Sequence, residues 1–163
     1  MLAISNTSPL LYLPQTGRLD LLKRLYGAVH LPPAVVSELR AGAALGVPVP
    51  ESGDLDWLRI LPVGNPYLVP LVTDLGPGET ETIALGLEHP GSLVILDDLL
   101  GGRAAHSVGL RVTGTLGVLL KARRIGILPS MTEAIAELRT AGMWIGDETA
   151  ANVIAQAGEM QRR

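Results

Sequence analysis

The chain has 163 residues, a length typical of one domain and short for two. Hydrophobic residues make up 47% and charged residues 18%, so the chain can bury a core and lacks the composition of a disordered protein. Because the net charge is −3, any polyanion must be bound by a local basic cluster or through metal ions. Cysteine is absent, which excludes disulfides, thiolate metal ligands and cysteine nucleophiles. With neither a signal-like N-terminus nor an apolar run long enough for a membrane span, we expect a soluble cytoplasmic protein.

Short apolar runs alternate with longer segments of helical periodicity, which is the pattern of an α/β domain. Residues 93–96, Leu-Val-Ile-Leu, are all apolar, as expected of a central parallel strand buried on both faces. The alternation predicts a single domain over residues 1–163, with three α/β/α layers and a mainly parallel central sheet. The predicted strands cover residues 2–5, 28–31, 57–63, 93–96 and 110–113.

Capping and breaking residues mark the helices between these strands. Pro14 and Gly17 should divide the first helical segment, and Pro33 suits the first turn of the next helix. Ser130 and Glu133 match a capping box. The predicted helices cover residues 8–26 in two pieces, 32–40, 79–89, 100–108, 115–124, 130–141 and 147–158, with loops at 42–56 and 64–78.

Polar residues follow the ends of several predicted strands, and open α/β sheets bind ligands beyond the carboxyl ends of their strands. Taken singly, most of them suit helix caps or a helix dipole. The adjacent pair Asp97 and Asp98 is the exception, because two partly desolvated acids repel each other unless a cation is present. Taken together, these oxygen donors predict a site for Mg²⁺ or Mn²⁺, ions that activate water and stabilise phosphoryl displacement. The set comprises Asn6, Thr7, Ser8, Glu38, Glu79, Glu81, Asp97, Asp98 and residues 113–115.

An ordered series of segments covering nearly the whole chain resembles the PIN-domain family, and a prokaryotic toxin-like branch of it in particular. The resemblance implies a Mg²⁺- or Mn²⁺-dependent ribonuclease that acts on RNA, forms a homodimer and acts as the toxin of a toxin–antitoxin pair with a small antitoxin protein. The segments are ISNTSPL at 4–10, GRLDLL at 17–22, LPPAVVSEL at 31–39, GETETIAL at 78–85, ILDD at 95–98 and GLRVTGTLG at 109–117.

The resemblance also implies which residues form the site. Its catalytic and metal-binding positions fall on Asn6, Glu38, Glu79 and Asp98, and Asp97 is a further candidate ligand. Glu79 is preferred to Glu81 because Ile83 and Leu87 continue its stripe along the helix. The candidate substrate-binding residues are Thr7, Ser8, Arg103 and Thr115.

Two departures from the family pattern leave alternatives open. Asn6 stands where the family usually has Asp, which removes a charge from the metal site. Leu99 and Leu100 stand where relatives commonly have arginines, whose phosphate contacts Arg103 would partly replace. One alternative is therefore a catalytically degenerate module that binds nucleic acid or protein without cleavage. Another is a small-ligand module with an anion site at residues 113–115.

Two further features have more than one interpretation. Lys121, Arg123 and Arg124 form a basic cluster that either compensates a helix dipole or contacts an RNA backbone. The aromatic residues are expected to be core or interface anchors rather than base-stacking platforms. They are Tyr12, Tyr26, Trp57, Tyr67 and Trp144.

Overall fold

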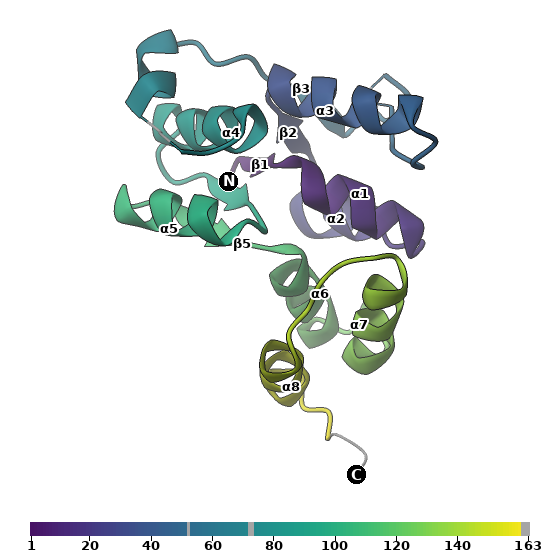
Figure 1. Ribbon diagram of the computed structural model, residues 1–163. Coiled ribbons are helices and arrows are strands. Elements are labelled where there is room, and N and C mark those ends of the chain that lie inside the picture. The colour runs from purple at the N-terminus through teal and green to yellow at the C-terminus, as the bar shows by residue number, and fades with distance from the viewer. Residues whose placement is uncertain (52, 72–73, 161–163) are drawn as a thin grey trace.

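A five-stranded sheet forms the centre of the computed structural model, which describes residues 1–51, 53–71 and 74–160 (Figure 1). The strand order is β3-β2-β1-β4-β5, and every pairing in the sheet is parallel. The predicted α/β class with a parallel sheet is therefore confirmed. The strands are β1 (Ala3–Ser5), β2 (Val29–Leu31), β3 (Leu58–Ile60), β4 (Leu93–Ile95) and β5 (Arg111–Thr113).

The helices follow the predicted order, with small differences in their bounds. The first helical segment is interrupted at Gly17, which has a φ of 69°, whereas Pro14 lies inside α1 and does not end it. The predicted loop at 64–78 contains a short 3₁₀-helix, η1 (Pro66–Leu71), while residues 52 and 72–73 of the two predicted loops lie outside the described residues. The α-helices are α1 (Thr7–Gln15), α2 (Asp20–Tyr26), α3 (Pro33–Ala44), α4 (Pro77–Glu88), α5 (Leu99–Ser107), α6 (Thr115–Arg124), α7 (Met131–Thr140) and α8 (Asp147–Gln156).

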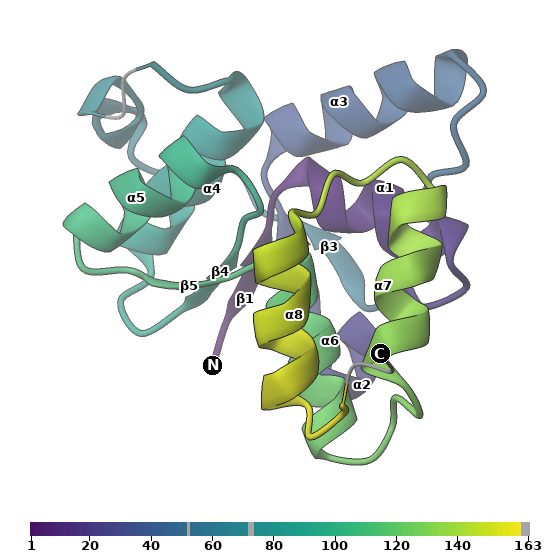
Figure 2. The ribbon, with the colours of Figure 1, turned by 60° about the horizontal axis from the view of Figure 1, so that its bottom comes forward.

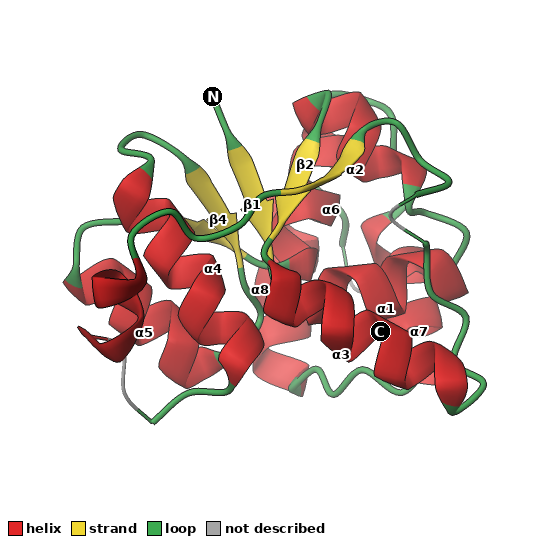
Figure 3. Cartoon of the chain, turned by 90° about the horizontal axis from the view of Figure 1, so that it is seen from above, coloured by secondary structure: helices red, strands yellow, loops and turns green. Residues whose placement is uncertain are grey.

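Helices cover both faces of the sheet. Figure 3 shows α4 and α5 on one side of the strands and α1, α2, α6 and α7 on the other. Side chains of β4 alternate between the two layers, as the pleat of a strand requires. Val94 and Leu96 pack with Ile83 of α4, whereas Ile95 belongs to the larger core on the opposite face. Helices α7 and α8 pack against α6 and enlarge that second layer (Figure 2).

The chain order creates a topological switch point beside β1. Strands β2 and β3 extend the sheet on one side of β1, and β4 and β5 extend it on the other. Parallel α/β sheets bind their ligands outside the carboxyl ends of the strands at such a point. Helix α3 contacts both α1 and α4 near this end of the sheet. In the part of the chain that the structure describes, no helix is both long and apolar enough to cross a membrane.

Candidate active site

Asn6 lies at the switch point, directly after β1, and is 1% exposed. Its backbone N–H donates to the carbonyl of Ile95 over 2.9 Å, which holds it beside the end of β4. Its Oδ1 accepts from the backbone N–H of Thr7 and caps α1. Its Nδ2 donates to Oε1 of Glu79 over 3.3 Å. Asn6 is thus both a helix cap and a direct neighbour of a candidate metal ligand.

Glu38 reaches the same place from α3 and is held by two donors. Its Oε1 accepts the backbone N–H of Gly78 over 3.0 Å, and its Oε2 accepts the hydroxyl of Thr7. Gly78 stands in the first turn of α4, where the helix dipole favours a carboxylate. A Cβ at Gly78 would lie 2.6 Å from Oε2 of Glu38, so only glycine permits this approach.

Glu79 and Glu81 share a helix but have different partners. Glu79 accepts from Asn6, and its carboxylate lies over Gly76, where a Cβ would be 2.6 Å from Oε2. Glu81 accepts the backbone N–H of Ala34 over 2.8 Å, in the first turn of α3. The structure therefore places Glu79 beside Asn6, while Glu81 satisfies a backbone donor of a neighbouring helix.

Asp97 and Asp98 point to two different helices. Asp97 is half-buried, and it accepts the backbone N–H of Thr115 over 2.6 Å and the Thr115 hydroxyl over 2.5 Å. Burial raises the pKa of Asp97, and the two Thr115 hydrogen bonds oppose that rise. Asp98 is exposed and accepts the backbone N–H of Gly101 over 2.6 Å, capping α5. Their different partners separate two charges that the sequence alone sets side by side.

The three remaining substrate-binding candidates are placed differently from Thr7. Thr115 is fully buried, and its N–H and hydroxyl both donate to Asp97. The N-terminus of α6 is therefore already capped by a carboxylate, so the structure does not favour an anion site at residues 113–115. Arg103 is exposed on α5, and Ser8 is half-buried in the first turn of α1.

The predicted metal site is only partly assembled. Asn6, Glu38 and Glu79 are linked through their partners, whereas Asp98 caps α5. Within residues 1–51, 53–71 and 74–160, no three Asp, Glu or His side chains are grouped so that they could hold an ion. The oxygen-only donors fit a hard divalent cation in ligand type, but the set lacks one charge at Asn6. The Asn6 amide instead supplies a hydrogen bond to Glu79, which offsets part of its negative charge.

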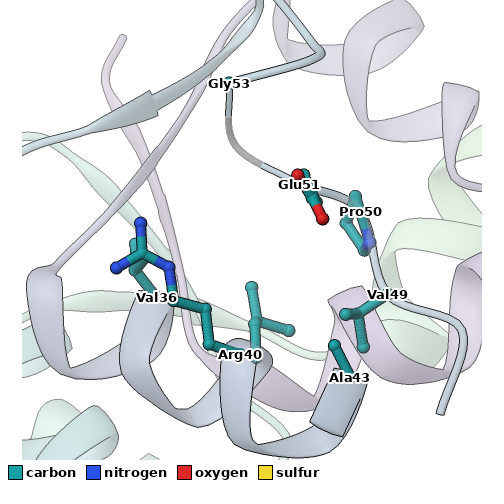
Figure 4. A pocket seen from close by; sticks show the side chains of 8 residues that line it. Val36, Arg40, Ala43, Val49, Pro50, Glu51 and Gly53 are labelled. Carbon is teal, nitrogen blue, oxygen red and sulfur yellow. The ribbon is translucent and has the colours of Figure 1, made fainter. Parts of the chain in front are cut away.

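A cavity of about 260 Å³ lies beside α3 but is separate from these side chains. Figure 4 shows Val36, Arg40 and Ala43 of α3 across the cavity from Val49, Pro50, Glu51 and Gly53. None of the candidate site residues lines this cavity. The candidate site at the switch point is therefore distinct from this cavity.

Sequence reasoning missed the glycines that accommodate these carboxylates. Gly76 and Gly78 lie under Glu79 and Glu38, and a Cβ at Gly114 would stand 2.6 Å from Oδ1 of Asp97. The signal was present as Gly-Pro-Gly-Glu at 76–79, because glycines just before an acid at a helix start indicate close approach of another group.

The comparison with known families agrees with this architecture. A family profile described as PIN domain matches residues 2–159, and the chain therefore belongs to the PIN-domain family. PIN domains are nuclease-like modules that generally use divalent metal ions, and membership indicates nucleic-acid binding. No match was found among curated proteins, and none among solved structures.

Proposed function

We propose that this PIN domain is a divalent-metal-dependent endoribonuclease. The proposal rests chiefly on the meeting of Asn6, Glu38 and Glu79 at the topological switch point, where α/β sheets bind ligands. The three side chains come from three separate segments of the chain, and helix capping alone does not require them to meet. Membership of the PIN-domain family makes nuclease chemistry the natural use of such a site.

The residues of the chain would hold Mg²⁺ or Mn²⁺ through carboxylate oxygens. Glu38 is fixed by Thr7 and Gly78, and Glu79 lies next to Asn6. Asp98 is exposed, and only its Oδ2 accepts a hydrogen bond among the described residues, so its Oδ1 is free to act as a third acidic ligand. A bound ion would supply a water of lowered pKa as the nucleophile for phosphodiester hydrolysis. Thr7 orients Glu38, and Arg103 is available to contact phosphate.

A second candidate function is nucleic-acid or protein binding without cleavage. The hydrogen bond from Nδ2 of Asn6 to Glu79 favours it, because an amide donor offsets a charge that a metal ion would otherwise balance. This alternative predicts that millimolar Mn²⁺ does not bind the wild-type protein.

A biological setting follows from the proposed ribonuclease. We infer that the protein is the toxin of a toxin–antitoxin pair, that a small antitoxin protein inhibits it, and that it acts as a homodimer in the cytoplasm. Family resemblance supports this setting, and the site geometry is compatible with it.

Calorimetric titration with Mn²⁺ tests the metal site directly. The wild type should bind, and Glu38→Ala and Asp98→Ala should each weaken binding at least tenfold. Glu133→Ala, which removes an exposed carboxylate in the first turn of α7, is the matched control and should bind as the wild type does. Cleavage of single-stranded RNA should follow the same order. Absence of wild-type binding at millimolar Mn²⁺ would overturn the ribonuclease in favour of the binding module.

A further inference from the structure

Four exposed basic residues lie in the last turns of α2 and α6, two helices that contact each other. Helices α2 and α6 are in contact, and the ammonium of Lys121 lies 4.6 Å from the centre of the Tyr26 ring, which joins the two ends. Lys121 and Arg124 are three residues apart and exposed, so they share one face of α6. We name this the α2–α6 basic surface. It comprises Lys23, Arg24, Lys121 and Arg124.

The charges of this surface are largely available to a ligand. Lys23 pairs with Asp56 at 3.6 Å and Arg24 with Asp20 at 3.9 Å, and the four side chains of these two ion pairs are at least half exposed. Such exposed pairs contribute about 0–1 kcal/mol and exchange readily with another anion. Within the described chain, Lys121 and Arg124 form no ion pair.

The neighbouring Arg123 has a different role. Its Nε donates to Glu159 over 2.8 Å, on the side of α6 that faces α8. The predicted basic cluster of Lys121, Arg123 and Arg124 therefore divides into one side chain that is ion-paired within the described fold and two that are not. A helix C-terminus attracts cations, but its partial charge of about −0.5 does not balance two full positive charges. Compensation of the helix dipole alone therefore does not explain the excess positive charge at Lys121 and Arg124.

Helix α6 connects this surface to the candidate active site. Its first residue, Thr115, is bonded to Asp97, and its last turn carries Lys121 and Arg124. Lys121 and Arg124 follow Thr115 by six and nine residues. At about 1.5 Å per residue, they lie about 9 and about 14 Å along the helix from that bond. A single extended RNA strand covers this length in a few nucleotides. One strand that occupies the acidic site could therefore extend to the basic surface.

We propose that the α2–α6 basic surface binds the backbone phosphates of a single RNA strand outside the acidic site. The choice of RNA as the polyanion rests on the proposed ribonuclease function, and positive charge on a chain of net charge −3 supplies the complementarity. The surface contributes affinity for longer RNA, and base sequence is not read there, because lysine and arginine contact phosphates without sequence information.

The test is fluorescence anisotropy with a labelled single-stranded RNA of about 20 nucleotides, in EDTA, so that no cleavage is needed. The measured quantity is the slope of the logarithm of the binding constant against the logarithm of the salt concentration. Each phosphate contact contributes about 0.7 to the size of this slope, so Lys121→Gln/Arg124→Gln, which removes two contacts, should reduce it by about 1.4. At about 0.1 M salt the affinity should drop about 25-fold. The matched control, Arg59→Gln/Arg111→Gln, removes the same charge from exposed residues on the two edge strands and should bind as the wild type does.

Two further measurements separate this proposal from the ribonuclease itself. Mn²⁺-dependent cleavage of a dinucleotide substrate should be unchanged in Lys121→Gln/Arg124→Gln, because a strand with a single phosphodiester occupies the acidic site alone and does not reach the surface. The charge-conserving variant Lys121→Arg/Arg124→Lys should retain wild-type binding and excludes a packing effect. Three results would each overturn the proposed role of the basic surface. The two glutamine double variants could lose RNA affinity equally, Lys121→Gln/Arg124→Gln could bind RNA as the wild type does, or the wild type could fail to bind the long RNA. None of these results would affect cleavage of the short substrate.

Discussion

Replacing Asn6 with aspartate should make the stability of the protein depend on metal. In the wild type, Nδ2 of Asn6 donates to Oε1 of Glu79 over 3.3 Å, and Asn6 is almost completely buried. In Asn6→Asp a carboxylate oxygen replaces that donor, so that two like charges face each other. Oδ1 can still accept from Thr7, so the cap of α1 is kept.

Two limits set the size of the effect. At a separation of about 3.3 Å and an effective dielectric constant of about 20, the repulsion is about 5 kcal/mol. Protonating one carboxylate relieves the repulsion at about 1.4 kcal/mol per pH unit above an ordinary pKa of about 4, which limits the cost to about 4 kcal/mol at pH 7. We therefore expect Asn6→Asp to lose about 2–4 kcal/mol of unfolding free energy at pH 7 without metal.

The pH dependence has a definite sign. Repulsion raises the folded-state pKa of the acidic pair, so the destabilisation is absent below the unfolded pKa of about 4 and grows as the pH rises above it. Metal should reverse the loss, because an ion that binds only the folded state at 100 times its Kd adds about 2.7 kcal/mol. Urea denaturation at pH 4 and pH 7, in EDTA and in Mn²⁺, measures both effects.

The double variant Asn6→Asp/Glu79→Gln is the matched control. It restores one amide and one carboxylate to the contact with their positions exchanged, so it should recover most of the stability lost at pH 7 in EDTA. A single variant as stable as the wild type at pH 7 in EDTA would refute the reasoning. So would a double variant no more stable than the single one.

Three other substitutions test the contacts that hold Glu38 and the hydrogen bonds that hold Glu159. Gly78→Ala places a Cβ 2.6 Å from Oε2 of Glu38, so calorimetry should show weakened Mn²⁺ binding, and urea denaturation a loss of about 1–3 kcal/mol. Thr7→Val removes the hydroxyl that holds Glu38 and should lower Mn²⁺-dependent cleavage about tenfold, whereas Thr7→Ser should restore it. Burial raises the pKa of Glu159, but hydrogen bonds from Thr132, Met131 and Arg123 prevail and lower it from 4.5 to about 2. Glu159→Gln should therefore lose about 2–3 kcal/mol at pH 7, and the difference in urea denaturation should disappear as the pH falls through that pKa.

The fold could be predicted because its strands are short apolar runs whose alternation with helices has few solutions. The sequence did not reveal η1, since a six-residue 3₁₀ segment has no periodic signature. Among the predicted aromatic anchors, Trp57 is buried, whereas Trp144 is 88% exposed beside the buried Ile145. Adjacent residues of a loop point in directions that local composition does not determine.

The acidic site was predictable as a set of residues but not as a geometry. Strand ends and family resemblance named the segments that carry Asn6, Glu38, Glu79 and Asp98. The partner of each carboxylate depends on side-chain torsions and on contacts between distant segments. The bond from Glu81 to Ala34, for example, depends on how α3 and α4 pack, and this contact is not encoded in either segment alone.

The four carboxylates at the switch point also indicate how strongly a metal ion should bind. Each already accepts at least one hydrogen bond, and most of the donors stand at helix N-termini, where the dipole favours negative charge. The donors are Thr7 and Gly78 for Glu38, Asn6 for Glu79, Thr115 for Asp97 and Gly101 for Asp98. An incoming ion must compete with the donors to Glu38, Glu79 and Asp97, whereas at Asp98 it can bind Oδ1 while Oδ2 caps α5, although it draws on the charge that strengthens the cap. Weak Mn²⁺ binding would thus reflect competition within the site, and Asn6→Asp, which removes one donor and adds one charge, should strengthen it more than any other single substitution at these positions.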